Sequence, residues 1–466
     1  MSADPAARPT VVVVPTPSLG NSTYLVGSSS EAVAVDVPRD AWRVAAVAEQ
    51  HGWRITHALE THVHNDYLSG ARELRRSHGS VIVAPGRGRY RFPHRGVDEG
   101  YSLGLATGGL VARATPGHTP EHLSWELQDG AGRPLALFSG GSLLLGGVGR
   151  TDLLGPQHTD ELTQAQFRSL RRLAELPDAV RVYPTHGAGS FCVAGDGDGP
   201  PSSTIGALRT WNAAFAATDE DSFAAELAAG RTRYPSYYAR MAPLNRRGPR
   251  LLGGPRSPRP LNAIDVMAAR AAGSFVVDVR DRRAFAERHI AGTLNVELGD
   301  SLSAYVGWLL PFDAPICLVV DDPADEIVAV DELRLIGFDH VSGHLDGGIH
   351  AWVAAGGEAR SYGTASWREL PAVAAAGELA GERVIDVRQP YEWAEGAIPG
   401  SRRIFLADLP AELDVLERDR EWMVTCRTGV RAAIAASLLD AAGFRVRPVV
   451  DGGVASLPPG ELESPG

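Results

Sequence analysis

The stretch ITHALETHVHNDYLSG, Ile55 to Gly70, decides how the first part of the chain folds. Its apolar beginning predicts a buried strand, and His62 and His64 follow that strand with one valine between them. Side chains two positions apart in extended backbone point to the same side, so both histidines can face one cavity. Asp66 continues a pattern of the form HxHxDH, but Tyr67 stands where this pattern has its last histidine. The stretch predicts a metal centre at the end of a strand and leaves open whether it holds one metal or two.

Three further loops carry histidine or aspartate in the same local setting. They are TPGHTPEHLSW with His118, GGVGRTDLLG with Asp152 and YPTHGAGSFC with His186. Each follows an apolar run and lies in or beside a glycine-containing turn. A lone histidine is more often a packed or surface residue than a ligand, but packing does not explain four such loops together. We therefore expect the four loops to converge on one site.

The motifs THVHND, TPGHTPEH, GRTDL and HGAGS resemble those of the metallo-β-lactamase fold superfamily. More narrowly, residues 1–241 are similar to the persulfide dioxygenases, the ethylmalonic-encephalopathy protein family. The first and last motifs are shared with the glyoxalase II hydrolases, whereas GRTDL, with Arg150 before Asp152, favours the dioxygenases. The resemblance implies an αββα sandwich. The runs Ala32–Val37 and Val81–Pro85 are typical of its buried strands, and Thr163–Leu176 is typical of a helix.

Tyr67 favours a site with one metal. In the superfamily members that hold two metals, the histidine at this position binds the second one. A phenol with a pKa of about 10 is a poor replacement at neutral pH. The ligands that the dioxygenase resemblance implies are His62, His118 and Asp152. Two histidines and one carboxylate form the facial triad of non-haem Fe(II) oxygenases.

Four neighbours of that triad are expected to orient the ligands rather than to bind the metal. They are His64, Asp66, His186 and Tyr67. The cofactor that the resemblance implies is therefore one Fe(II) in the first domain. Zinc is the alternative, because the same three ligands can hold it.

Beyond residue 260 the chain repeats itself. The stretch FVVDVRDRRAFAERHIAGTLNV, residues 275–296, parallels VIDVRQPYEWAEGAIPGSRRI, residues 384–404. Asp278 and Asp386 are 108 positions apart, as are Gly292 and Gly400. A period of this length indicates two copies of a whole domain. Strand, helix and strand follow one another in each copy, which favours α/β domains with parallel sheets.

The second copy contains MVTCRTGVRAAIAASLLDAAGF, which places Cys426 between a strand and a helix. The helix start attracts anions, and Arg427 and Arg431 add positive charge, so we expect the thiolate to be favoured. The run CRTGVR resembles the active-site loop of rhodanese sulfurtransferases, which implies that Cys426, Arg427 and Arg431 are catalytic.

The first copy departs from this pattern. It reads LVVDDPADEIVAVDEL, residues 318–333, and its spacing from the later DGG motif sets Asp321 opposite Cys426. Acidic residues there would repel an anionic sulfur donor. We expect a rhodanese-like domain without activity.

The predicted fold class is α/β: a metallo-β-lactamase αββα sandwich followed by two rhodanese-like domains with parallel sheets. The domain boundaries we predict are 1–241 for the dioxygenase domain, 242–260 for a linker rich in Arg, Pro and Gly, 261–360 for the inactive rhodanese and 361–466 for the active one.

Composition narrows the function classes. A formal net charge of −11 argues against a general nucleic-acid or anionic-membrane binder. The N-terminus lacks the basic and apolar regions of a signal peptide, and three cysteines cannot form a disulfide framework. These features predict a cytoplasmic protein, and related proteins suggest a dimer or tetramer. Cys192 has two interpretations, structural packing or a redox or sulfur-relay role.

The whole chain resembles fusions of a persulfide dioxygenase with an inactive and then an active rhodanese. Such a fusion would oxidise a low-molecular-weight thiol persulfide with O2 to sulfite and convert sulfite to thiosulfate at Cys426, in sulfide detoxification. Two alternatives stay open: a zinc-dependent thioester hydrolase like glyoxalase II, and a persulfide carrier or sensor. Glutathione, coenzyme A, bacillithiol and mycothiol are all candidate carriers.

Overall fold

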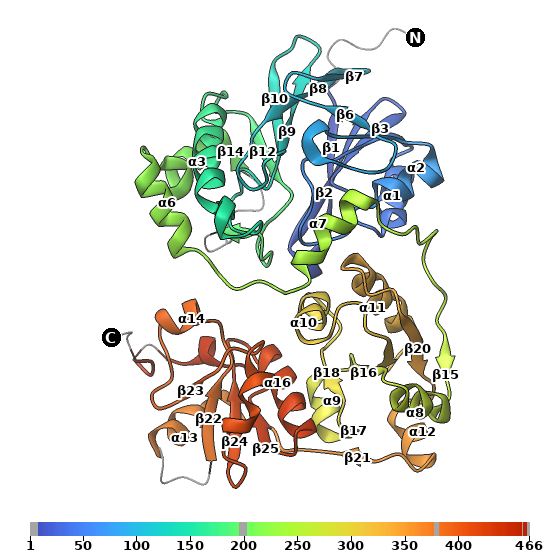
Figure 1. Ribbon diagram of the computed structural model, residues 1–466, viewed down its shortest axis with the longest axis vertical. Coiled ribbons are helices and arrows are strands. Elements are labelled where there is room, and N and C mark those ends of the chain that lie inside the picture. The colour runs from blue at the N-terminus through green and yellow to red at the C-terminus, as the bar shows by residue number, and fades with distance from the viewer. Residues whose placement is uncertain (1–7, 195–202, 377–381, 459, 464–466) are drawn as a thin grey trace. The chain divides into compact units, whose positions relative to one another are not determined.

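The computed structural model describes residues 8–194, 203–376, 382–458 and 460–463. The chain divides into two compact units (Figure 1). The first is Met1–Pro255 together with Arg334–Gly337, and the second is Arg256–Leu333 together with Phe338–Gly466. Among the described residues, no helix is both long and apolar enough to cross a membrane.

Two mixed sheets form the middle layers of the first unit (Figure 1). One sheet runs in the order β1 (Thr10–Thr16), β2 (Asn21–Ser28), β3 (Glu31–Val35), β4 (Arg54–Leu59), β5 (Val81–Pro85) and β6 (Arg95–Val97). The other runs in the order β14 (Ser203–Thr204), β12 (Arg181–Pro184), β10 (Pro134–Gly140), β9 (Leu123–Asp129), β8 (Gly108–Ala114) and β7 (Ser102–Leu105). A short ribbon pairs β11 (Val148–Gly149) with β13 (Val193–Ala194).

Helices cover the outer face of each sheet, which completes the predicted αββα sandwich. The first sheet packs on α1 (Ala41–Gln50) and α2 (Ala71–His78), and the second on α3 (Pro156–Leu173), α4 (Ile205–Trp211), α5 (Ala213–Ala216) and α6 (Glu220–Ala229). Between the sheets lies a core that includes Val26, Trp125 and Phe138, all fully buried. Burial of such side chains on both sides of each sheet drives the layering.

The predicted strands Ala32–Val37 and Val81–Pro85 correspond to β3 and β5. Helix α3 begins at Pro156, earlier than the predicted start at Thr163, because proline after Gly155 is favourable in the first helical turn.

The predicted linker differs more from the structure. Its first residues belong to helix α7 (Tyr238–Arg247), although Pro243 lies inside that helix. Asn245 explains why the helix continues. Its Nδ2 donates to the carbonyl oxygens of His64 and Tyr67 at 2.9 and 2.8 Å, and its Oδ1 accepts from the backbone N–H of Ser69 at 2.9 Å. The segment therefore supports the histidine loop rather than only connecting domains.

In the second unit, the first repeat has a sheet of parallel strands. Its order is β15 (Pro260–Leu261), β20 (Val341–Leu345), β19 (Ile316–Val319), β16 (Phe275–Asp278) and β18 (Leu294–Asn295). Its helices are α8 (Ala263–Ala271), α9 (Arg282–Glu287), α10 (Leu302–Leu309), α11 (Pro323–Leu335) and α12 (Gly348–Ala354). A short ribbon joins β17 (His289–Ile290) to β21 (Ala359–Arg360).

The second repeat has the same kind of parallel sheet, in the order β23 (Arg402–Arg403), β22 (Glu382–Asp386), β24 (Glu421–Thr425) and β25 (Arg445–Pro448). Its helices are α13 (Leu370–Ala376), α14 (Pro390–Ala394), α15 (Leu409–Glu412) and α16 (Val430–Ala441). The prediction of two α/β copies with parallel sheets is confirmed. The end of the copy, residues 464–466, lies outside the described residues.

Candidate metal centre and thiol loop

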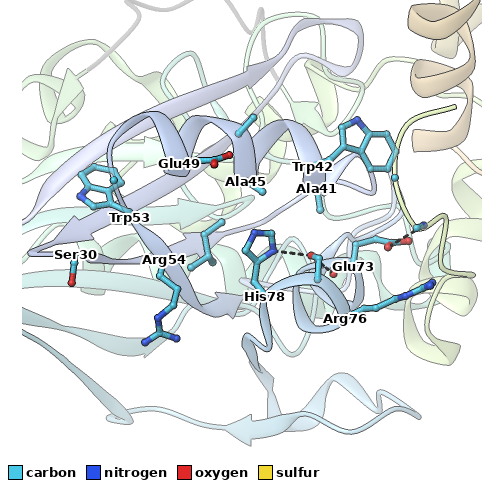
Figure 2. A pocket seen from close by; sticks show the side chains of 16 residues that line it. Ser30, Ala41, Trp42, Ala45, Glu49, Trp53, Arg54, Glu73, Arg76 and His78 are labelled. Carbon is cyan, nitrogen blue, oxygen red and sulfur yellow. Dashed lines mark hydrogen bonds between the residues drawn. The ribbon is translucent and has the colours of Figure 1, made fainter. Parts of the chain in front are cut away.

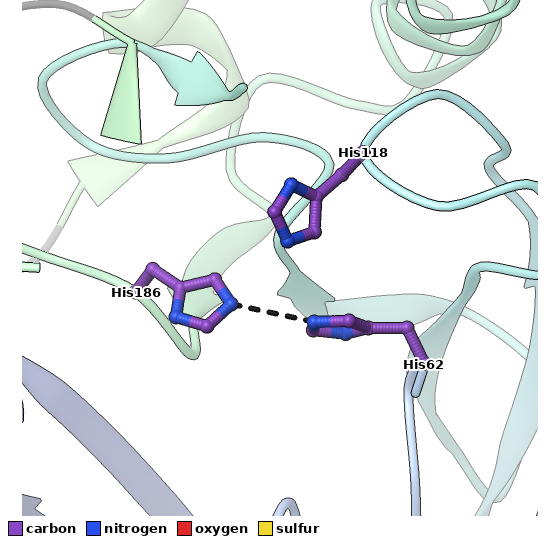
Figure 3. A group of neighbouring side chains, drawn as sticks. All are labelled: His62, His118 and His186. Atoms are coloured by element: carbon purple, nitrogen blue, oxygen red, sulfur yellow. Dashed lines mark hydrogen bonds between the residues drawn. The ribbon is translucent and has the colours of Figure 1, made fainter. Parts of the chain in front are cut away.

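Three histidines from three loops of the first unit meet at one point (Figure 3). His62 follows β4, His118 follows β8 and His186 follows β12. One nitrogen of each lies within 4.8 Å of the others, and all three side chains are fully buried. The two Nε2 atoms of His62 and His186 are 3.4 Å apart. Convergence of these loops, expected from the sequence, brings ligand-type nitrogens together.

Each of these rings is held through its other nitrogen. Nδ1 of His118 lies 2.8 Å from the carbonyl oxygen of Arg150, and Nδ1 of His62 lies 2.8 Å from Oγ1 of Thr61. Nδ1 of His186 lies 3.0 Å from Oδ1 of Asn21. Such contacts fix the ring orientation and leave Nε2 facing the centre, as in protein metal sites.

The donor set fits a metal ion. Burial, with His186 next to it, lowers the pKa of His118 to about 3, and burial holds the pKa of His62 well below its usual range. Both imidazoles are therefore neutral, the form that binds metals. Nε2 of His118 is buried without a hydrogen-bond partner among the described residues. An orphaned buried nitrogen of this kind is costly unless a ligand satisfies it.

His64 differs from these three rings. Its Nε2 lies 3.0 Å from Oε2 of Glu60, 3.3 Å from Oδ1 of Asp36 and 3.1 Å from the hydroxyl of Tyr67. Burial alone would lower the pKa of His64, but Asp36 and Glu60 outweigh it and raise the pKa to about 10. The Tyr67 ring stacks on His64 with centroids 4.4 Å apart. Nδ1 of His64 is buried without a hydrogen-bond partner among the described residues. His64 also belongs to two further groups that could hold a metal ion, one with Asp36 and His62 and one with Asp66 and His186. The supporting role of His64 and Tyr67 stays a prediction.

Asp66 contacts two neighbouring side chains. Its Oδ2 accepts a hydrogen bond from Nδ2 of Asn21 at 2.6 Å and lies 3.3 Å from Nδ1 of His186. These contacts hold the pKa of Asp66 at about 2, against the effect of burial.

Asp152 is not among the residues that the structure brings together at the centre. Arg150 binds its carboxylate through two contacts, Nε to Oδ1 at 2.8 Å and Nη2 to Oδ2 at 2.7 Å. This pair lowers the pKa of Asp152 although burial opposes it. His186 takes the third position beside His62 and His118. The role of Asp152 as a ligand stays a prediction.

Sequence reasoning missed Asp36, Glu60 and His122. Asp36 ends the β3 segment with a φ of 54°, and its Oδ1 accepts from the backbone N–H of Thr61 at 2.7 Å. Both ring nitrogens of His122 have hydrogen-bond partners, since Nδ1 contacts Thr115 and Nε2 accepts from the N–H of Gly141 at 3.0 Å. An aspartate after an apolar strand was the available signal for Asp36.

Cys192 lies in the same unit and is fully buried. Burial raises the pKa of its thiol well above the usual range, which keeps it protonated. A protonated buried thiol is a poor nucleophile, so the packing interpretation fits the geometry.

A hollow of about 860 Å³ lies elsewhere on the first unit, beside α1 and α2 (Figure 2). Trp42, Trp53 and Arg76 line it. The carboxylate of Glu73 in its wall accepts from the backbone N–H groups of Leu252 and Gly253, which is a structural use. A smaller hollow of about 210 Å³ reaches His186 itself.

The thiol loop of the second repeat has the expected cradle. The backbone N–H of Gly429 donates to Sγ of Cys426 at 3.1 Å, and Gly429 has a φ of 98°, which favours glycine. Arg427 is exposed. Arg431 donates from Nη2 to Oε1 of Glu392 at 2.8 Å, and the catalytic roles of Arg427 and Arg431 stay predictions. The charge of Arg431 is already paired, and Glu392 was not found from the sequence.

Strand register corrects the alignment of the two loops. Asp278 pairs with Val319, and the equivalent Asp386 pairs with Thr425. Val320, and not Asp321, therefore follows the strand at the position of Cys426. Helix α11 then starts after the loop 320–322, whereas α16 starts after the longer loop 426–429. The first repeat lacks both the thiol and one residue of the cradle.

Comparisons with known proteins agree with this architecture. The metallo-beta-lactamase superfamily profile matches residues 20–186, and the rhodanese-like domain profile matches residues 263–355 and 369–457. The hydroxyacylglutathione hydrolase of Rhodopseudomonas palustris (strain BisA53) is 32% identical over 170 residues, 36% of this chain and 62% of that protein. The protein of the same name from Synechococcus sp. (strain WH7803) is 34% identical over 184 residues, 37% of this chain and 68% of that protein. This chain thus spans 62% of the length of the first of these relatives.

One solved structure matches the fold over more of the chain. A metallo-beta-lactamase from Staphylococcus aureus subsp. aureus COL matches with a TM-score of 0.65 and 29% identity, over 73% of this chain and 99% of that one. ETHE1 from Myxococcus xanthus matches with a TM-score of 0.44 and 25% identity, over 51% of this chain and 98% of that one. Through its first domain the chain belongs to the metallo-β-lactamase superfamily, and two rhodanese-like domains follow that domain in the sequence.

Proposed function

We propose that this protein is a persulfide dioxygenase with one Fe(II), joined to a thiosulfate-forming sulfurtransferase. The observation that carries the proposal is the position of Tyr67. Its hydroxyl lies 3.1 Å from Nε2 of His64, at the sequence position where two-metal members have a ligand. His62, His118 and His186 form one group that could hold a metal, and His64 belongs to two others, with Asp36 and His62 and with Asp66 and His186. The tyrosine in place of a ligand histidine is what supports one metal rather than two.

The residues that would hold the ion are His62 and His118, with Asp152 or His186 as the third ligand. When bound there, Fe(II) would supply open positions for O2 and for the thiolate of the substrate. The chain itself orients the ligand side chains and keeps water away from the centre. The Arg150 carbonyl fixes the His118 ring at 2.8 Å, and burial of all three histidines excludes bulk water from the centre.

The second reaction takes place at Cys426. The thiolate attacks the outer sulfur of a carrier persulfide, RSSH, so that the S–S bond breaks, RS⁻ leaves and Cys426 carries the persulfide. Sulfite then attacks that outer sulfur, thiosulfate forms and the thiolate returns. The Gly429 N–H, 3.1 Å from Sγ, stabilises the anionic sulfur in both steps.

The two reactions share an intermediate, since sulfite leaves the first site and is the acceptor at the second. Linking the sites in one chain raises their effective concentration. We propose sulfide detoxification as the role, with a thiol persulfide, O2 and sulfite as the partners. We also propose a cytoplasmic homo-oligomer, a dimer or tetramer, that binds neither nucleic acid nor membranes.

Oxygen uptake tests the first reaction. Protein loaded with Fe(II) without air and given glutathione persulfide is expected to consume O2 and release sulfite. Asp152→Ala separates the two ligand sets, because it abolishes uptake if the carboxylate is a ligand and preserves it if His186 is the third ligand. Absence of uptake from the loaded wild-type protein with several carrier persulfides would sink the proposal.

Metal stoichiometry tests the role of Tyr67. We expect one equivalent of metal per wild-type chain and up to two in Tyr67→His, because the variant restores the missing imidazole. Tyr67→Phe is the matched control and should keep one equivalent, since it removes only the hydroxyl. Two equivalents in the wild-type protein would overturn the single-metal assignment.

A second candidate function has a specific observation in its favour. The relatives of 32–34% identity over the first domain bear the name hydroxyacylglutathione hydrolase. A zinc-dependent thioester hydrolase would contain zinc as purified and hydrolyse S-lactoylglutathione. The carrier or sensor alternative predicts instead a stable persulfide on Cys426 with negligible O2 uptake.

A further inference from the structure

We propose that a pocket lined by arginines binds the acidic groups of the thiol that carries the persulfide. The pocket has a volume of about 340 Å³, within the range of small-molecule sites. It is lined by Arg87, Arg89, Pro120, Glu121 and Arg246, and we call it the arginine pocket. The inference rests on the proposed function and deepens it, because it names the class of carrier.

The arginine pocket shares its wall with the histidine loop. Oε1 of Glu121 accepts a hydrogen bond from the backbone N–H of Val63 at 2.9 Å, between His62 and His64. The hydroxyl of Tyr90, next to Arg89, donates to the carbonyl oxygen of His62 at 3.2 Å. A carrier held in this pocket by its distant end would therefore have the histidine centre close to its sulfur end.

Positive charge exceeds negative charge in the pocket, because three arginines and one glutamate line it. Arg87 and Arg89 are exposed and make no hydrogen bond or ion pair with another described residue. Arg246 donates from Nε to the carbonyl oxygen of Gly88 at 3.1 Å, which holds its guanidinium beside the other two. The one acidic residue, Glu121, is buried and committed to Val63. Guanidinium groups bind carboxylates and phosphates through paired hydrogen bonds, so an anion is the ligand this pocket fits.

The backbone of the pocket is unusual in a way that supports a binding role. Arg89 has a φ of 57°, in the left-handed region that side chains other than glycine rarely adopt. At Gly88 a Cβ would lie 2.4 Å from the Tyr90 ring, so only glycine fits there. Strained turns of this kind persist where the position of a side chain matters for function. Here the turn places Arg89 at the pocket and Tyr90 on the histidine loop.

The positive charge of the arginine pocket distinguishes between the candidate carriers. Glutathione has two carboxylates, and coenzyme A has phosphates, so both offer anions at a distance from the sulfur. Mycothiol is built from sugars and has no acidic group. The arginine pocket therefore favours an acidic carrier over a neutral one.

Binding measured without catalysis tests this assignment. Calorimetry with the full-length protein would use S-methylglutathione and coenzyme A as probes. We expect at least one of them to bind and the Arg87→Ala/Arg89→Ala double variant to weaken that binding by about tenfold or more. The probe that binds distinguishes a carboxylate from a phosphate carrier. The matched control is Arg91→Ala/Arg95→Ala, which removes two exposed arginines outside the pocket and should change binding less than about twofold.

Three binding results would overturn the inference: no binding of either probe to the wild-type protein, equal loss in the two double variants, or binding of mycothiol as tight as that of the acidic probes. These results are separate from those on oxygen uptake. A protein that binds a probe through the arginines but consumes no O2 keeps the pocket and loses the dioxygenase. Uptake with a KM unchanged in the arginine variant keeps the dioxygenase and loses the pocket.

Discussion

The two rhodanese-like repeats have the same supporting ion pair and different loops. In the first repeat Nη2 of Arg280 contacts Oδ2 of Asp278 at 2.7 Å, and in the second Arg388 contacts Asp386 at the same distance. Each arginine also donates from Nη2 to a carbonyl oxygen eight residues later, of Arg288 at 3.0 Å and of Gly396 at 2.8 Å.

The loops that follow strands β19 and β24 differ between the two repeats. The loop of the second repeat surrounds Cys426 with a backbone donor, whereas the shorter loop of the first repeat carries two aspartates. The ion pair survives in the copy without a thiol because it serves the fold, so retention of the fold gives no information about activity. Four predictions break or sharpen this comparison.

The largest effect is expected from Cys426→Ala. Sulfur transfer from a persulfide to sulfite should fall by a factor on the order of 10³ or more, because the nucleophile is gone. Oxygen uptake by the first domain should be unchanged. Cys317→Ala is the matched control, since Cys317 is buried in β19 of the first repeat and should leave transfer intact. Transfer that persists in Cys426→Ala would move the chemistry elsewhere.

The next effect concerns stability. Asp278→Ala and Asp386→Ala each leave a buried arginine without its partner, which should cost about 3–5 kcal/mol of unfolding free energy. The measurement is urea denaturation of the full chain followed by tryptophan fluorescence. The exposed Glu287→Ala provides the control and should change little. A large cost in one repeat and none in the other would show that the two pairs are not equivalent.

A smaller effect is expected from removing a contact through which the first repeat orders the thiol loop of the second. Nη1 of Arg282 lies 3.4 Å from the carbonyl oxygen of Thr428 in the thiol loop. Arg282→Ala should lower the rate of sulfur transfer by about two- to tenfold through a less ordered loop. Arg288→Ala, an exposed arginine of the same repeat, should not. Equal rates in the two variants would mean that the repeats act independently.

The smallest effect is expected from giving the first repeat a thiol. Val320→Cys in the Cys426→Ala background should restore no sulfur transfer, because the loop is one residue shorter and has no glycine at the equivalent of Gly429. Asp321→Cys is the companion variant for the alignment by sequence spacing. Measurable transfer by either one would show that a thiol alone is sufficient.

Much of the architecture could be predicted because it depends on residues close together in the sequence. The alternation of His62 and His64 after a strand, the spacing of 108 positions between Asp278 and Asp386, and the loop that begins at Cys426 are all local patterns. Strand ends and helix starts obey short-range rules, so these patterns identified the folds and most of the candidate residues.

Contacts between distant segments could not be predicted in this way. Asn245 reaches His64 from a segment that the composition assigned to a linker, and Arg246 joins Arg87 and Arg89 in one pocket. Strand register, and not sequence spacing, showed that Val320 is the residue of the first repeat that corresponds to Cys426 in the second.

By itself, the sequence determined a metallo-β-lactamase region followed by two rhodanese-like repeats, a histidine-rich centre and a loop around Cys426, because each depends on residues close together in the chain. Only the tertiary structure decided that His186 stands beside His62 and His118 while Arg150 holds Asp152. The physical reason is that the loops of His62, His118 and His186 lie far apart in the sequence, so packing decides which of their side chains meet. Arg150 and Asp152 are two positions apart, but the sequence does not report whether the carboxylate binds this arginine or faces the histidine centre.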